Sequence, residues 1–101
     1  MYWSASIIMK IKNENTFEEL FQETIVLIES KNIEQAKNKA VEIGVNSESK
    51  YLNNESEKIE VKFDAILDIQ KVVGSKIKDK TEIFTRHYKK DEYVLIRTKI
   101  D

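Results

Sequence analysis

Residues 58–70 read KIEVKFDAILDIQ, and this stretch decides the fold because apolar and polar side chains alternate along it. The apolar side carries Ile59, Val61, Phe63, Ala65, Leu67 and Ile69. The other side is polar and is interrupted only by Ile66. A period of two over this length predicts a long β-strand with one buried and one solvated face, which is typical of antiparallel sheets.

Two further strands are predicted ahead of this one. Residues 2–12 alternate in the same way, and a polar turn at 13–16 follows them. Residues 18–29 form the second strand. Its middle, residues 25–28, is apolar on both faces, which predicts an interior position with cover on both sides.

The sequence leaves the pairing register of these two strands open. One alignment faces Trp3 with Val26, and the other faces it with Leu27. In either case the apolar faces are expected to meet in one core. The predicted core residues are Trp3, Ile7, Met9, Val26, Ile28, Ala36, Ala40, Val61, Phe63, Leu67 and Ile69.

Residues 32–44 predict a helix. Asn32 is a favourable N-cap, and Gln35 follows it at the spacing of a capping box. The apolar stripe consists of Ile33, Ala36, Ala40, Val41 and Ile43. Gly44 is expected to end the helix in the left-handed conformation that glycine adopts easily.

The remaining elements complete an α+β fold class. Residues 49–52 form a weak short strand, residues 81–88 a longer one, and residues 93–100 a last one. Because one helix cannot cover both faces of a parallel sheet, we expect an antiparallel sheet of about five strands with the helix packed on one face. The predicted order is ββαβββ(β), in a single domain over residues 1–101.

Composition excludes several classes of protein. The chain has no cysteine, so disulfides and cysteine-based zinc sites are excluded, and its two glycines are too few for a glycine-rich phosphate loop. No apolar run approaches the roughly 20 residues that span a bilayer. The first residues, MYWSASIIMKIK, have the pattern of a strand and not of a signal peptide. We therefore expect a cytoplasmic protein with no membrane contact.

No catalytic chemistry is evident in the sequence. His87 is the only histidine, which is too few for a histidine-based metal site, and no serine lies in a nucleophile-elbow motif. We therefore predict no catalytic residue, no metal and no cofactor.

Charge is unevenly distributed along the chain. Residues 13–34 carry six glutamates against one lysine, whereas residues 71–90 carry seven basic residues against two acidic ones. Either the two segments lie side by side and their opposite charges offset each other, or they form a polarised surface that steers a charged partner. The candidate partner-binding patch in the basic segment is Lys76, Lys78, Lys80, Phe84, Arg86, Tyr88, Lys89 and Lys90.

A second candidate surface comes from apolar residues on otherwise polar strand faces. One helix covers one face of a sheet, so apolar residues on the other face need a different cover. Closed two-fold pairing is the commonest way to provide it, which makes a homodimer one prediction. The candidate dimer face consists of Ile8, Ile25, Leu27 and Ile66.

The order of these segments resembles a known family. YWSASI opens the chain, ETIVLIES leads into NIEQAKNKAVEIG, KIEVKFDAILDIQKV forms the long strand, and TEIFTRHY closes the pattern. Over about residues 2–88 this resembles the bacterial family described as domain of unknown function 4288, with residues 89–101 as a C-terminal strand extension. The resemblance implies a small stand-alone bacterial domain and transfers no activity, cofactor or site residue.

These observations favour a non-enzymatic protein-binding module, such as an immunity-type or accessory protein. The alternative is binding of an anionic ligand or nucleic acid through residues 71–90, which a fall of affinity with salt would reveal. A protein partner is favoured over nucleic acid. An enzyme would instead require a pocket that holds titratable groups with perturbed pKa values.

Overall fold

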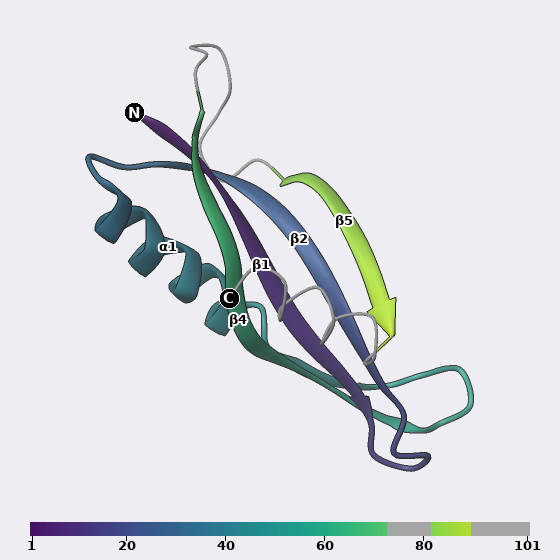
Figure 1. The fold of residues 1–101 in the computed structure, drawn as a ribbon. Helices are drawn as coiled ribbons and strands as arrows, with labels where there is room; N and C mark the ends of the chain where they lie inside the picture. Colours follow the sequence, from purple (N-terminus) through teal and green to yellow (C-terminus); the bar gives the residue numbers. More distant parts are fainter. Residues whose placement is uncertain (73–81, 90–101) are drawn as a thin grey trace.

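The computed structural model describes residues 1–72 and 82–89, and within them one helix packs on an antiparallel sheet (Figure 1). The elements are β1 (Tyr2–Asn13), β2 (Glu19–Glu29), α1 (Ile33–Asn46), β3 (Ser49–Leu52), β4 (Lys58–Val72) and β5 (Glu82–Lys89). The strands lie in the order β3-β4-β1-β2-β5. The predicted α+β class is therefore confirmed. The expected strand at 93–100 lies outside the described residues.

The register of β1 and β2 differs from both predicted alignments. Trp3 lies opposite Ile28, not opposite Val26 or Leu27. The turn at 14–18 sets this alignment, because a backbone hydrogen bond of 2.9 Å closes its base and leaves the two strands no freedom to slip. As expected for a strand that is apolar on both faces, β2 lies in the interior of the sheet, between β1 and β5.

Two irregularities in β4 correct the predicted face assignment. Asp64 and Leu67 have no register partner on β1, and each extra residue shifts the alternation by one position. As a result Ile66 packs into the core beneath the helix, whereas Leu67 packs against Ile8 on the other side. Ala65 is the residue that lies opposite Ile8. The prediction that Ile66 interrupts the polar face is therefore wrong.

The start of α1 follows its sequence signals. The side-chain oxygen of Asn32 accepts a hydrogen bond of 2.9 Å from the backbone N–H of Gln35, which satisfies one of the free donors at the helix start. Ala36 and Ala40 are fully buried against the sheet, and their small side chains allow a close approach. Ile33 is exposed and does not belong to the buried stripe.

Gly44 has a different role from the predicted one. The helix continues through it to Asn46, and Gly44 does not adopt a positive φ. Gly44 is instead buried against β4, where a Cβ atom at this position would lie 2.3 Å from Cδ1 of Phe63. The glycine is needed because the helix backbone lies directly on the phenyl ring.

The main core lies between α1 and the sheet. Its buried members are Ala5, Ile7, Met9, Val26, Ile28, Ala36 and Ala40, and its partly buried ones are Trp3, Ile43, Val61, Phe63, Ile66 and Ile69. The predicted core residues all belong to it except Leu67. A smaller cluster of Ile8, Phe21 and Leu67 forms on the other side of the sheet.

Candidate interaction surface at the turn end of the sheet

Two turns lie side by side at one end of the sheet, the end away from the start of the helix (Figure 1). One turn, residues 14–18, joins β1 to β2, and the other, residues 53–57, joins β3 to β4. The backbone N–H of Glu14 donates to the carbonyl of Lys58 at 2.8 Å, and the N–H of Lys58 donates to the side chain of Asn15 at 2.9 Å. These bonds join the two turns into one unit, which we call the turn end.

An asparagine shapes each of the two turns. Oδ1 of Asn13 accepts the backbone N–H groups two and three residues further on, at 2.9 and 3.1 Å. Oδ1 of Asn53 accepts those two and four residues further on, both at 2.9 Å. Asparagine is frequent in turns because its short side chain bonds to the backbone in this way. The turn end is therefore fixed by side chains as well as by the strands.

A carboxylate connects the two asparagines. Oε1 of Glu57 accepts hydrogen bonds from the side-chain amides of Asn53 and Asn13, both at 3.1 Å. The bond from Asn53 contributes most and the bond from Asn13 next, and together they lower the pKa of Glu57 because they favour the ionised form. An ionised Glu57 thus ties the turn of β1 and β2 to the turn of β3 and β4.

Phe17 stands out within the turn end. Its φ is 64°, in the left-handed region that a bulky side chain rarely adopts, at a cost of roughly 1–2 kcal/mol. The backbone is held there by a 2.8 Å hydrogen bond from the N–H of Phe17 to the carbonyl of Asn13. The ring is 75% exposed, so burial within the chain does not offset the cost. Ser56 in the neighbouring turn has a similar φ of 60°, so it is the exposed ring on a strained backbone that distinguishes Phe17. Strained residues cluster at functional sites.

Other apolar side chains are exposed on the neighbouring strands. Tyr51 is 51% and Leu52 63% exposed on β3, and Leu20 is also exposed at the start of β2. A pocket of about 370 Å³ opens beside them. It is lined by Glu14, Lys50, Tyr51, Leu52, Lys58 and Ile59. One turn of the turn end thus carries an exposed aromatic side chain, and the strand that leads into the other turn carries two exposed apolar residues beside a pocket.

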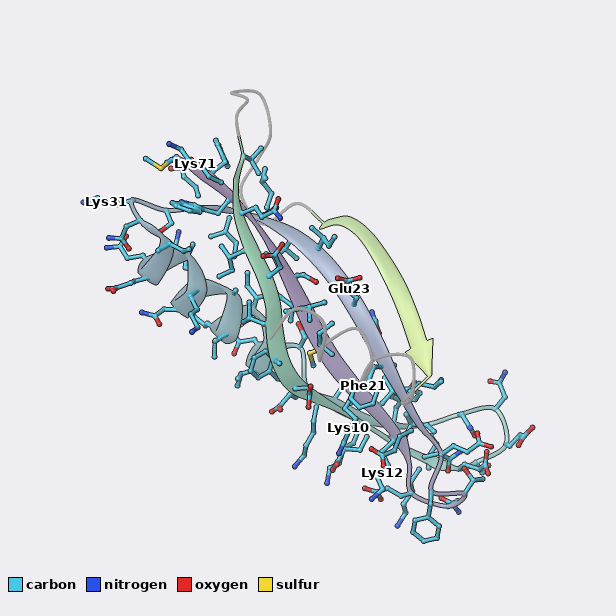
Figure 2. All side chains as sticks on the ribbon, viewed as in Figure 1. Lys10, Lys12, Phe21, Glu23, Lys31 and Lys71 are labelled. Carbon is cyan, nitrogen blue, oxygen red and sulfur yellow. The ribbon has the colours of Figure 1, made fainter. Side chains whose placement is uncertain are left out.

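The middle of the sheet holds a buried polar pair. The hydroxyl of Ser6 on β1 donates a hydrogen bond to the carboxylate of Glu23 on β2, and both side chains are buried. Glu23 lies far from the turn end, halfway along the sheet (Figure 2). The bond joins β1 to β2 on the face away from the helix. Across residues 1–72 and 82–89, no cluster of three or more acidic, histidine or cysteine side chains is placed to hold a metal ion.

The predicted partner-binding patch is described only in part. Lys76, Lys78, Lys80 and Lys90 lie outside the described residues, whereas Phe84, Arg86, Tyr88 and Lys89 belong to β5. That strand pairs with β2, and Arg86 takes the register position opposite Glu23. The part of the basic segment that forms β5 therefore lies beside the acidic segment, which is one of the two arrangements that the charge pattern allowed. The patch itself stays a prediction.

The four residues of the predicted dimer face do not form one accessible surface. Ile8 and Leu27 lie on the face away from the helix and are 0% exposed within a single chain. Ile25 is half-buried, and Ile66 packs on the helix side. A homodimer stays a prediction, but these side chains offer it little apolar surface.

Sequence reasoning missed the turn end as a site. The asparagine turn at 13–16 was expected, yet the exposed neighbours Phe17, Tyr51 and Leu52 were not singled out. The one available signal was Phe17 itself, an aromatic residue between the polar turn and an acidic strand start.

The comparisons with known proteins identify a family. No helix in the described part of the chain is long and apolar enough to cross a membrane. No curated protein and no solved structure matches the chain significantly. One family model does match, over residues 2–85. Since that match covers most of the sequence, the chain belongs to the family described as Domain of unknown function (DUF4288).

Proposed function

We propose that this chain is a non-enzymatic protein-binding module that contacts its partner through the turn end, in the manner of an immunity-type or accessory protein. The observation that supports the proposal is Phe17, an exposed aromatic ring on a strained backbone. Aromatic residues are enriched at protein interfaces, where they supply much of the binding energy. Full burial of a phenylalanine side chain is worth roughly 1.5–3 kcal/mol.

The rigidity of the turn end supports the same function. Side-chain bonds from Asn13 and Asn53 fix both turns before any partner arrives. A surface that is already ordered loses little conformational entropy on binding, so more of the contact energy appears as affinity. Tyr51 and Leu52 on β3 are further exposed apolar residues that a partner can contact.

Site-specific photo-crosslinking tests the proposal. A benzophenone amino acid replaces Phe17 in one variant and Asn38 in the other, an exposed residue on the outer side of α1. Both are produced in cells that contain the chain naturally. We expect a discrete heavier adduct with one protein from position 17 and none from position 38. Equal adducts at the two positions would contradict the proposal.

A competition experiment then tests the contribution of the ring. Excess unlabelled wild-type chain should suppress the adduct, whereas excess Phe17→Ser chain should not. Val45→Ser is the matched control, because Val45 is an exposed apolar residue on α1, away from the turn end. We expect it to compete like the wild type. Competition by Phe17→Ser at wild-type strength would exclude Phe17 as the contact.

The alternative function, binding of an anionic ligand or nucleic acid through residues 71–90, stays a prediction. Its support is the basic composition of the segment. A labelled single-stranded oligonucleotide that binds more weakly as salt rises would favour it, because phosphate contacts release counterions.

A further inference from the structure

β3 forms an open edge of the sheet. It pairs with β4 on one side, and no strand of the described sheet lies beyond it. All four of its residues, Ser49–Leu52, are exposed. The backbone groups on the outer side of an edge strand are free to bond to another chain.

The hydrogen-bonding phase shows which groups point outward. The N–H of Asn53 donates to the carbonyl of Glu57 at 3.0 Å, so this is a bonded pair of the ladder between β3 and β4. In an antiparallel ladder the bonded pairs recur at every second residue, which directs the backbone of Tyr51 towards β4. Lys50 and Leu52 therefore direct their N–H and C=O groups outward.

A side chain caps a free backbone donor on β4, whereas the outward backbone groups of β3 have no such cap in the described part of the chain. Just beyond β3, the backbone N–H of Phe63 donates to Oε2 of Glu48 at 3.0 Å. This side chain occupies an edge donor that would otherwise extend the pairing surface. The outward groups of Lys50 and Leu52 face no such cap in the described structure.

The side chains around the edge indicate what would bind there. Tyr51 and Leu52 are apolar and exposed, and the pocket of about 370 Å³ adjoins them. The Lys50 side chain is 74% exposed, and its ammonium group lies 3.3 Å from one carboxylate oxygen of Glu60. An ammonium group has three donors, so it can bind a second carboxylate as well. The pocket wall also carries one positive charge from Lys58 and one negative charge from Glu14, so the Lys50 side chain is the one that favours an acidic residue at the edge itself.

We propose that β3 binds an extended segment of a partner protein as an additional strand, an inference that rests on the proposed protein-binding function. The segment carries two successive apolar residues opposite Leu52 and Tyr51 and an acidic residue opposite Lys50. In an antiparallel arrangement its sequence reads apolar, apolar, acidic, and in a parallel one the order is reversed. Backbone bonds to Lys50 and Leu52 supply affinity, and the neighbouring side chains supply selectivity.

A displayed library of random nine-residue peptides tests the proposal. It is selected on the wild-type chain alone. The enriched peptides are then measured on Lys50→Pro, which removes one outward N–H without removing a bond to β4. We expect enriched peptides with the apolar–apolar–acidic pattern in either direction. Their affinity should fall about tenfold or more for Lys50→Pro. Lys50→Ala retains the N–H and loses only the charge, so it should weaken binding a few-fold, and less so at high salt.

Amide exchange measured on the wild-type chain covers the case in which Lys50→Pro fails to fold. With a selected peptide bound, exchange should slow at Lys50 and Leu52 and stay unchanged at Tyr51, whose amide already bonds to β4. No enrichment, peptides without the pattern, or equal binding to a folded Lys50→Pro variant would overturn the inference. The inference would also be overturned if exchange slowed only at other residues, or if the chain dimerised through β3 without any peptide. Crosslinking from position 17 is independent of these results, so the proposed function can survive the failure of this inference.

Discussion

Replacing Gly44 with alanine tests how closely α1 lies on the sheet. In an isolated helix this change is favourable by roughly 0.5–1 kcal/mol, because alanine loses less backbone entropy than glycine. In this chain the added Cβ would lie 2.3 Å from Cδ1, 2.8 Å from Cε1 and 3.1 Å from Cγ of Phe63. These distances are well inside van der Waals contact, so the ring or the helix must move.

The clash should outweigh the gain in helix propensity. Overpacking a core costs typically about 1–3 kcal/mol. Three atoms of the Phe63 ring meet the new methyl group, and the ring, although only partly buried, packs against the helix-side core, so moving it disturbs that packing. We expect a net loss of about 1–2 kcal/mol in the free energy of unfolding. For a chain of this length that lowers Tm by roughly 5–15 °C.

Urea denaturation of the Gly44→Ala variant provides the measurement. Val45→Ala is the control, since it changes an exposed neighbour in the same turn of the helix. In a second pair of variants, Gly44→Ala is introduced into a Phe63→Leu background. There it should cost less stability than it does in the wild type, because the smaller side chain makes room for the methyl group. If Gly44→Ala is as stable as the wild type or more so, the close approach of α1 to β4 is wrong.

Two further predictions concern acid stability and self-association. The pKa of Glu57 is lowered from its usual value of 4.5, so its hydrogen bonds stabilise the fold above that pH, and the contribution is lost as pH falls through the lower folded value. The stability difference between wild type and Glu57→Gln should therefore be greatest near neutral pH and should shrink below pH 4.5, when followed by urea denaturation at a series of pH values. For the homodimer, sedimentation velocity at micromolar concentrations should show twice the mass of one chain, and a single-chain mass at every concentration would contradict it.

Much of the fold follows from periodicity and turn chemistry. The alternation over residues 2–12 and 58–70 predicts two long strands, and Asn32 predicts the start of the helix to within one residue. These signals are local, because each depends on residues within a few positions along the chain. Local signals also predicted that β2 is an interior strand.

The errors all involve contacts between distant segments. Ala65, Ile66 and Leu67 are consecutive apolar residues, so either face assignment satisfies the alternation, and only pairing with β1 shows where the extra residues lie. A glycine at position 44 is compatible both with a helix end and with a close packing contact. Only the position of Phe63 beside it in the fold distinguishes the two roles.

The candidate site was harder to predict for the same reason. The turn end forms only when two turns, about 40 residues apart in the sequence, bond to each other. The open edge of β3 depends on the strand order of the whole sheet.

The chain has one tryptophan, and its position determines what intrinsic fluorescence can report. Trp3 packs against the helix-side core, and its Nε1–H donates at 3.2 Å to the carbonyl of Ser30, just before α1. Asn13 lies ten positions further along the same strand, which corresponds to roughly 33 Å. Its emission should therefore change when the helix leaves the sheet but not when a partner docks on the turn end. A fluorescence titration without a response would accordingly say nothing about binding there.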